Sequence, residues 1–260
     1  MAGSPDMKAP SSPALLRLTN VSKSFGGIQA LSGVSCAVPQ GQIIGIIGPN
    51  GAGKTTLFNV ITGAYRASAG EVGFEADSIT DWPPHRIARA GIARTFQNIR
   101  LFAGMTVFEH LLVAQPHREA ALRRLLPTRW ADPAALARAE EVLGFFGLEG
   151  VRDRMARSLP YGSQRKVEMA RALSARPKLL LLDEPVAGMN REEADEVRAR
   201  LLALRATGLT ILLIEHDMTF VMNLCDYLYV LDFGALIADG LPAEVRSNPI
   251  VLDAYLGTEA

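Results

Sequence analysis

Residues 46–56, IIGPNGAGKTT, place a glycine-rich turn directly before a lysine and two threonines. They match the phosphate-loop pattern G-x-x-x-x-G-K-[ST]. Glycines let backbone N–H groups turn toward phosphate oxygens, and a following helix adds the positive end of its dipole. Within this loop the lysine would reach the β- and γ-phosphates and the first threonine a magnesium ion. The residues predicted to bind a nucleoside triphosphate are Gly48, Pro49, Asn50, Gly51, Ala52, Gly53, Lys54, Thr55 and Thr56.

A pair of acidic residues follows a second apolar run. Asp183 and Glu184 come directly after the leucines 179–182. Open α/β sheets bind ligands at the carboxyl ends of their strands. We therefore expect Asp183 to hold Mg²⁺ and Glu184 to activate the attacking water. Pro185 predicts an extended backbone at Glu184, which would point the two carboxylates in different directions.

His216 ends a third apolar run, LTILLIEHD at 209–217. Its position after a buried strand predicts that the imidazole reaches the γ-phosphate, so we count it with Lys54 and Glu184 among the catalytic residues. The chain's other histidines, His85 and His110 as well as His117, are expected to be incidental to the chemistry.

These residues need a framework of strands and helices to position them. Residues 15–45 alternate in short apolar stretches and predict strands joined by tight turns, and IIGII at 43–47 predicts a strand buried on both faces. The residues after the phosphate loop have helical spacing. Residues 178–185 and 209–217 predict buried parallel strands joined by an amphipathic helix that stops at Gly208. DYLYVLDFGALIADG at 226–240 predicts a hairpin.

The composition changes from about residue 98 to 175, where Leu, Ala, Arg and Glu dominate. Thr106 and Glu109 form a capping-box pattern at the start of one predicted helix. A second predicted helix runs from Pro133 to a stop at Gly147. We interpret 98–170 as a helical insertion in an α/β core made of 14–97 and 171–260, preceded by a disordered tail at 1–13.

Composition limits the classes of function. The 27 basic residues balance the 27 acidic ones, which argues against a protein that coats nucleic acid, so no nucleic-acid partner is expected. Cys36 and Cys225 lack metal-site spacing and are interpreted as buried, reduced thiols. No signal peptide is visible, and the longest apolar runs fall short of the roughly 18–20 residues that a membrane span requires. If the chain works at a membrane, another subunit crosses it.

Taken in order, the phosphate loop, LPYGSQRKVEMARAL, LLLLDEP and IEHD closely resemble the ATP-binding cassette (ABC) transport ATPases over nearly all of 15–240. The resemblance implies a P-loop NTPase core of mixed sheet with antiparallel N-terminal strands, an all-helical signature subdomain, ATP with Mg²⁺, and a dimer that sandwiches two ATP molecules. Gly162 would allow a close approach of the backbone, and a helix that begins near residues 163–164 would direct its N-terminal amides at the partner's γ-phosphate. By resemblance Phe25 stacks on adenine, Gln97 senses magnesium, and the residues at the dimer seam are Leu159, Tyr161, Gly162, Ser163 and Asn190.

Two departures from the family pattern affect the signature. The usual L-S-G-G-Q reads L-P-Y-G-S here, and Pro160 removes both a hydroxyl and an N–H. Asn190 stands where an aspartate is usual. With a different cassette as partner, the two ATP sites would be chemically unequal.

The stretch ARTFQNIRLFAGMTVFEH, the YG signature and the ending VLDAYLG resemble the LivG-type cassette of branched-chain amino-acid importers. This implies a peripheral ATPase on the cytoplasmic face of the inner membrane. Its partners would be a second cassette, either a copy of itself or a LivF-type one, two integral membrane permeases and, indirectly, a periplasmic binding protein. Residues 98–110 would lie near the permeases, while ATP binding closes the dimer and hydrolysis reopens it.

Several alternatives use the same loop. An ABC exporter of lipid or lipopolysaccharide is the closest of them. A ribosome-acting ABC protein would carry two cassettes in one chain, and a DNA-repair ATPase would need long coiled coils. A small-molecule kinase would not need the signature stretch. Genes for permeases, a second cassette and a secreted binding protein beside this one would indicate an importer.

Overall fold

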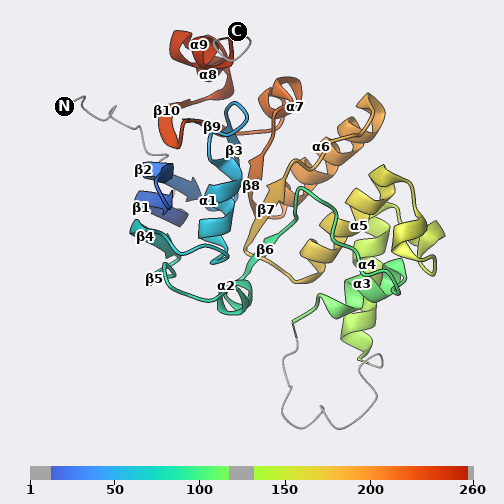
Figure 1. The fold of residues 1–260 in the computed structure, drawn as a ribbon. Coiled ribbons are helices and arrows are strands. Elements are labelled where there is room, and N and C mark those ends of the chain that lie inside the picture. The colour runs from blue at the N-terminus through green and yellow to red at the C-terminus, as the bar shows by residue number, and fades with distance from the viewer. Residues whose placement is uncertain (1–12, 117–131, 257–260) are drawn as a thin grey trace. The chain divides into compact units, whose positions relative to one another are not determined.

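The computed structural model describes residues 13–116 and 132–256, which form two compact units (Figure 1). Among the described residues, one unit is made of 13–88 and 204–256, and the other of 89–116 and 132–203. The predicted tail up to residue 12, and residues 117–131 of the predicted insertion, lie outside the described residues. Within the described residues, no helix is long and apolar enough to cross a bilayer.

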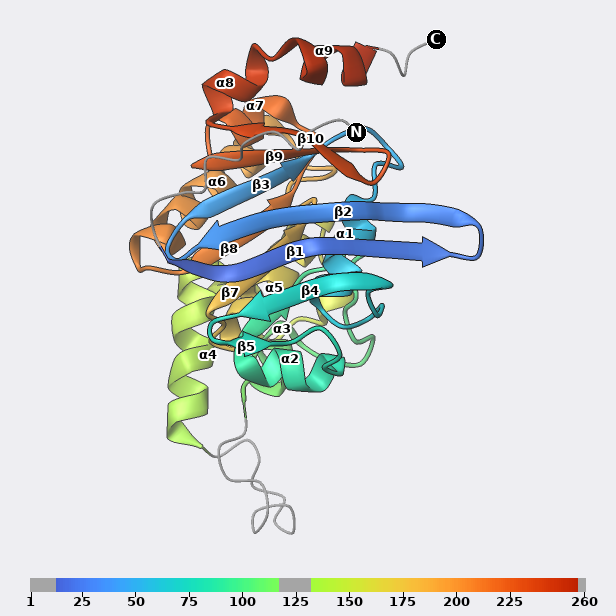
Figure 2. The same ribbon diagram turned by 90° about the vertical axis from the view of Figure 1, so that its left-hand side faces the viewer.

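The first unit begins with an antiparallel sheet in which β1 (Ala14–Phe25) pairs with β2 (Ile28–Pro39) on one side and β4 (Ala69–Phe74) on the other. The short β5 (Asp77–Ser78) adds to β4, and Figure 2 shows these strands side by side. Gly26 turns the chain between β1 and β2 with a φ of 58°, which glycine adopts without strain. The predicted N-terminal strands are confirmed.

A parallel sheet in the same unit carries the phosphate loop. Strand β3 (Ile43–Ile47) lies between β8 (Thr210–Ile214) and β9 (Tyr227–Asp232), parallel to both. Every residue of β3 and β8 is buried, as their unbroken apolar sequences predict. Strand β10 (Ala235–Gly240) pairs antiparallel with β9, which confirms the predicted hairpin.

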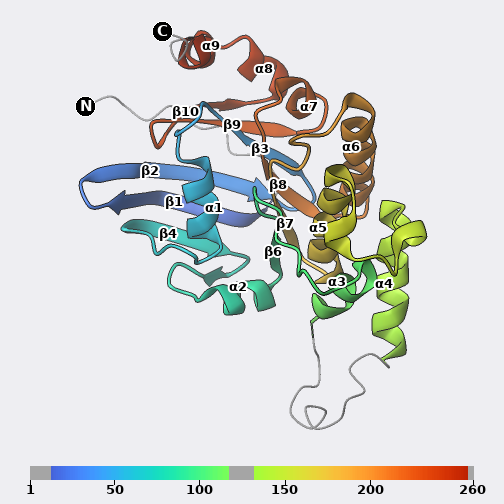
Figure 3. The same cartoon turned by 45° about the vertical axis from the view of Figure 1, so that its right-hand side comes forward.

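The second unit contains a parallel strand pair and a group of packed helices. Strand β6 (Ile92–Arg94) pairs with β7 (Leu179–Asp183). Figure 3 shows α3 (Val107–Val113), α4 (Pro133–Phe146) and α5 (Tyr161–Ser174) lying together, and their residues are in contact. The remaining helices of the described residues are α1 (Lys54–Ile61), α2 (Pro84–Ala90), α6 (Arg191–Ala206), α7 (Met218–Met222), α8 (Pro242–Arg246) and α9 (Pro249–Leu256), with 3₁₀ turns at Glu149–Val151 and Ala156–Ser158.

Local sequence signals explain where these helices start and stop. The hydroxyl of Thr106 accepts from the Glu109 N–H at 3.2 Å, and the Glu109 carboxylate accepts from the Thr106 N–H at 2.8 Å. This confirms the capping box at the start of α3. Helix α4 starts at Pro133 and ends before Gly147, whose φ is 66°. Both predicted helices are confirmed.

The α/β fold class is confirmed, whereas the predicted subdomain boundaries stay a prediction. The unit 89–203 takes in β6, β7 and most of α6 in addition to helices from the predicted insertion 98–170. Helices and strands of the second unit thus share one packed body, which a division by sequence character alone does not anticipate.

Candidate functional site

The phosphate loop lies between β3 and α1 and depends on three glycines with positive φ. Gly48, Gly51 and Gly53 have φ values of 147°, 81° and 98°. A Cβ on Gly48 would come within 1.9 Å of the Leu231 carbonyl oxygen, so no other residue fits there. The loop therefore folds tightly against the end of β9, with the side chains of Asn50 and Thr55 exposed.

Lys54 is folded back onto its own loop. Its side chain is buried, and Nζ donates to the carbonyl oxygens of Gly48 at 2.6 Å and Pro49 at 2.8 Å. No side chain caps the N-terminus of α1, where Gly53 is the N-cap. The loop thus combines an ammonium group with the N-terminal turn of a helix, and both favour an anion.

Phe25 presents its ring at the surface of the first unit. The side chain is 42% exposed, and its ring meets that of Tyr65 edge to face at 5.1 Å between centroids. The Lys23 ammonium lies 4.8 Å from the centroid of Phe25. An exposed, laterally supported ring is suited to stacking on a flat ligand.

His216 follows β8 and also lies at the surface. Its side chain is 62% exposed, with Nδ1 at 3.7 Å from Oε2 of the buried Glu215. That carboxylate accepts from the backbone N–H groups of His216 at 3.0 Å and Asp217 at 3.4 Å. Glu215 therefore holds the turn that carries the imidazole, a role that its place in an apolar run did not indicate.

Asp183 ends β7 with one carboxylate oxygen engaged. Oδ2 accepts from Arg94 at 2.8 Å, and both side chains are buried. Burial raises the pKa of Asp183, although the hydrogen bond from Arg94 opposes that shift. Oδ1 is buried and has no hydrogen-bond partner among the described residues.

The donor set fits the magnesium that the phosphate-loop pattern implies. A hard cation prefers carboxylate oxygens, and Mg²⁺ is usually bound by one or two carboxylates plus phosphates and water. Each unit supplies a ligand of that kind: the second unit has the unsatisfied oxygen of Asp183, and the first unit has the hydroxyl of the exposed Thr55. Within the described ranges, no group of three or more His, Cys, Asp or Glu side chains could hold a metal by itself.

Glu184 has an unusual backbone. Its φ is 50°, so the extended geometry predicted from Pro185 is wrong. A non-glycine residue in the left-handed region costs roughly 1–3 kcal/mol, and such residues gather at functional sites. Oε1 of Glu184 accepts from Nε2 of Gln97 at 3.3 Å. The positive φ and this hydrogen bond define where the carboxylate lies within the second unit.

The signature stretch leads into α5, which begins at Tyr161, about one half-turn earlier than predicted. Pro160 is the N-cap with a φ of −54°, a value that suits a helix start. Gly162 and Ser163 therefore lie in the first turn, and the carboxylate of Glu193 packs where a Cβ on Gly162 would be, at 2.7 Å. Leu159 is buried before the helix, whereas Tyr161 is 46% exposed.

Asn190 has a structural role that the sequence did not reveal. Its Oδ1 accepts from the Glu193 N–H at 2.9 Å, and the Glu193 carboxylate accepts from the Asn190 N–H at 3.0 Å. This reciprocal pair caps the start of α6. A partner across a dimer seam would therefore meet a residue that already stabilises a helix end.

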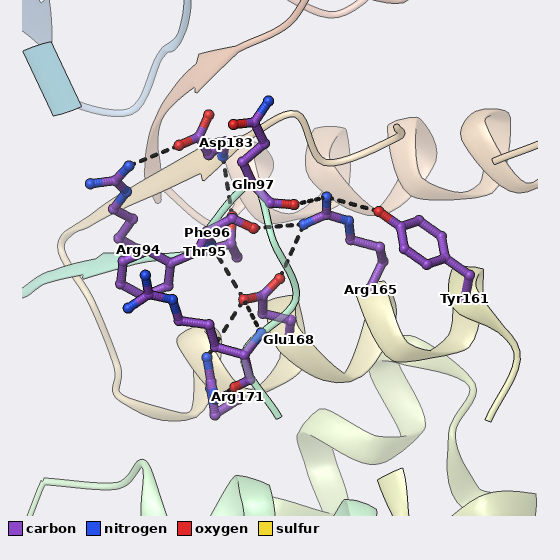
Figure 4. Close-up of polar contacts among 10 residues, drawn as sticks. Arg94, Thr95, Phe96, Gln97, Tyr161, Arg165, Glu168, Arg171 and Asp183 are labelled. Carbon is purple, nitrogen blue, oxygen red and sulfur yellow. Dashed lines mark hydrogen bonds and ion pairs between the residues drawn. The ribbon is translucent and has the colours of Figure 1, made fainter. Parts of the chain in front are cut away.

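A buried polar cluster next to Gln97 had no clear signal in the sequence (Figure 4). Arg165 and Glu168 on α5 are 2% and 0% exposed and pair at 3.2 Å. Arg165 donates to the carbonyl oxygens of Phe96, at 2.7 Å, and Gln97. The spacing of these charges along a helix gave a weak signal, because such a pattern more often marks a solvated face.

His110 is buried and serves the fold. Its Nε2 accepts from the Phe102 N–H at 2.9 Å, so Nδ1 carries the proton that it donates to the Thr106 carbonyl oxygen at 2.7 Å. Burial lowers the pKa of His110 and favours this neutral form.

The sequence of this chain matches known families and proteins along most of its length. The ABC transporter family profile matches residues 31–187, and a profile described as branched-chain amino acid ATP-binding cassette transporter matches 235–260. The high-affinity branched-chain amino acid transport ATP-binding protein BraF of Pseudomonas aeruginosa is 43% identical over 94% of this chain and 98% of its own. The corresponding protein LivG of Escherichia coli is 42% identical over 95% of this chain and 99% of its own.

Solved structures agree with the sequence relatives. A nucleotide-free ATP-binding cassette from an ABC transporter aligns with a TM-score of 0.84 at 37% identity, covering 94% of this chain and 99% of that one. The structure of an ABC transporter cassette in its ADP conformation aligns with the same TM-score at 39% identity, covering 95% of this chain and 100% of that one. The chain belongs to the ABC transporter family and is one of its ATPase cassettes.

Proposed function

We propose that this chain is the ATP-hydrolysing subunit of an importer for branched-chain or related amino acids. The observation that carries the cargo class is the match of residues 235–260 to the branched-chain amino acid cassette profile, together with relatives of that name along almost the whole chain. The cassette acts on ATP and leaves recognition of the cargo to other subunits.

The chemical roles follow from the residue types. The phosphate loop binds the triphosphate through backbone amides and Lys54, while Phe25 stacks on adenine. Glu184 takes the proton of the attacking water, and His216 orients the water's surroundings. A preformed loop with an ammonium group already inside it supports these assignments, because such groups stabilise charge without reorganising.

Asp183, Thr55 and Gln97 are the proposed magnesium residues. Bound Mg²⁺ would neutralise charge on the phosphates. The unsatisfied Oδ1 of Asp183 supports its place among the ligands, since a buried oxygen without a partner is costly unless a cation or water completes it.

Dimerisation would bring the signature residues to a second nucleotide. Leu159, Tyr161, Gly162, Ser163 and Asn190 are proposed to face the partner cassette, which is a second copy or a LivF-type chain. ATP closes such a dimer because it binds the closed state more tightly than the open one. Two integral permeases, reached through residues near 98–110, and a periplasmic binding protein complete the proposed importer at the cytoplasmic face of the inner membrane.

Transport in a reconstituted system tests the proposal. The chain would be co-expressed with the permease and cassette genes beside it, purified in detergent and placed in proteoliposomes with the secreted binding protein. We expect uptake of radiolabelled leucine, isoleucine or valine that requires ATP on the cassette side. ATP hydrolysis without stimulation by any amino acid, or stimulation by a lipid substrate, would contradict the assignment.

A further inference from the structure

Hydrogen bonds at both ends of Gln97, at its backbone carbonyl and at its side-chain amide, link the signature stretch to Glu184. Nη2 of Arg165 donates to the Tyr161 hydroxyl at 3.1 Å and also to the Gln97 carbonyl oxygen. Nε2 of Gln97 then donates to Glu184 at 3.3 Å. Figure 4 shows Arg165 extending between Gln97 on one side and Tyr161 on the other.

Side chains of α5 hold the loop that carries Gln97 through hydrogen bonds to its backbone carbonyl oxygens and to its backbone N–H groups. Arg165 donates to the carbonyl oxygens of Phe96 and Gln97. Oε1 of Glu168 accepts from the N–H groups of Phe96 at 3.3 Å and Arg100 at 3.4 Å. A shift of α5 therefore has to move the loop with it or break several hydrogen bonds.

Stability alone is a weak reason for such an arrangement. Arg165 and Glu168 are almost completely buried, and the desolvation of a buried ion pair often exceeds its Coulombic gain. What the pair provides is geometry, because a planar guanidinium with fixed donors can hold two carbonyl oxygens and a hydroxyl at set angles. Tyr161 is the exposed end of this chain of contacts, at 46% exposure.

We propose that Arg165 is a positioning residue that couples Tyr161 to Gln97, and through Gln97 to Glu184. The inference rests on the proposed function, in which Tyr161 faces the partner's nucleotide and Glu184 serves this chain's own. Contact of the partner's nucleotide with the signature stretch changes the hydrogen bond between Tyr161 and Arg165. Arg165 passes that change to Gln97, so each cassette adjusts its own Glu184 to the occupancy of the other site.

Replacing Tyr161 by Phe tests this directly, since it removes one hydroxyl and keeps the ring. ATP hydrolysis would be measured against Mg-ATP concentration in the assembled transporter, for the native chain and for Tyr161→Phe and Arg165→Lys. We expect kcat to fall by roughly two- to thirtyfold in both variants, the range in which residues along coupled networks act. The Hill coefficient for ATP should fall toward one, and KM should change less than kcat.

Arg200→Lys is the matched control. Arg200 also donates to a backbone carbonyl oxygen, that of Phe145 at 2.9 Å, and pairs with Glu196 at 2.6 Å, within the same unit. Among the described residues it forms no hydrogen bond or ion pair with the loop at 96–100, so kcat and cooperativity should stay at native values. An equal loss in Arg200→Lys and Arg165→Lys would mean that the effect is general loosening of the fold, which contradicts the proposal.

A double-mutant cycle separates coupling from independent effects. If Tyr161 acts through Gln97, then Tyr161→Phe should change kcat little in a Gln97→Ala background. The inference would be overturned if the losses of kcat in the two single variants multiplied fully in the double variant. Native kinetics for Tyr161→Phe alone would overturn it as well. Failure of the proposed function is distinguishable, because it would show as a native transporter without ATP hydrolysis or amino-acid transport.

Discussion

The side-chain amide of Gln97 and the carboxylate of Glu184 meet at 3.3 Å because their strands are in register. Arg94, the last residue of β6, pairs with Leu181 of β7, and on each side the chain reaches Gln97 or Glu184 three residues after that pair, just beyond the end of the strand. Two parallel strands thus deliver both groups to one edge. The positive φ of Glu184 then turns the chain away from the strand direction.

The backbone at Glu184 stores strain that can be measured without its carboxylate. Glu184→Ala and Glu184→Gly both remove the acid, but only glycine adopts a φ of 50° without cost. We expect the Gly variant to unfold at a higher denaturant concentration, with an advantage of about 1 kcal/mol in the free energy of unfolding. A more stable Ala variant would mean that this backbone is not strained.

Gly48 is predicted to be irreplaceable, while Gly51 is not. An added Cβ would overlap the Leu231 carbonyl oxygen at Gly48 but would meet nothing within 4 Å at Gly51. Gly48→Ala should lose at least about 3 kcal/mol of unfolding free energy, and Gly51→Ala about 1 kcal/mol from its positive φ alone. Chemical denaturation followed by circular dichroism checks both values. Equal losses of unfolding free energy in the two variants would contradict the predicted overlap at Gly48.

Asn190 allows its structural and functional roles to be separated. Asn190→Ala should lower the free energy of unfolding by about 1 kcal/mol, because α6 loses its N-cap. Asn190→Asp keeps the cap and restores the charge usual in the family, so stability should stay native while ATP turnover changes. Thermal unfolding and steady-state hydrolysis report the two quantities. Native turnover in both variants would remove Asn190 from the proposed seam.

Glu168 is predicted to be essential to the second unit. Burial raises the pKa of Glu168, while its arginine neighbours and two backbone N–H groups favour the charged form. Glu168→Gln would leave the buried Arg165 and the half-buried Arg171 without their counter-charge, at a cost of roughly 3–5 kcal/mol in the free energy of unfolding. Glu140→Gln, at an exposed pair with Arg152, should change stability by less than about 0.5 kcal/mol. Similar losses of unfolding free energy in Glu168→Gln and Glu140→Gln would contradict the idea that burial makes the Glu168 contacts important.

Much of the fold could be predicted because local signals and long-range packing agree. The apolar run at 43–47 predicts a doubly covered strand, and the glycines of the loop match backbone angles that only glycine accepts easily. Thr106, Pro133 and Gly147 marked helix ends through contacts within a few residues. Such interactions can be predicted from the sequence, because the two residues that form them are only a few positions apart.

What could not be predicted depends on partners far apart in the chain. Arg94 and Asp183 are 89 residues apart, and Arg165 reaches Gln97 across 68. The proline after Glu184 gave a wrong expectation, because the turn at the end of β7 overrides the local preference. Asn190 was assigned from a family pattern, which does not report a helix cap.

Single-turnover hydrolysis by Glu184→Gln tests the central claim most directly. The variant and the native chain would be loaded with radiolabelled Mg-ATP in the assembled transporter, and bound nucleotide and released phosphate would be followed separately. Because the amide cannot take a proton from water, we expect ATP binding within about threefold of native and hydrolysis at least ~100-fold slower. Hydrolysis at the native rate in Glu184→Gln would contradict the account.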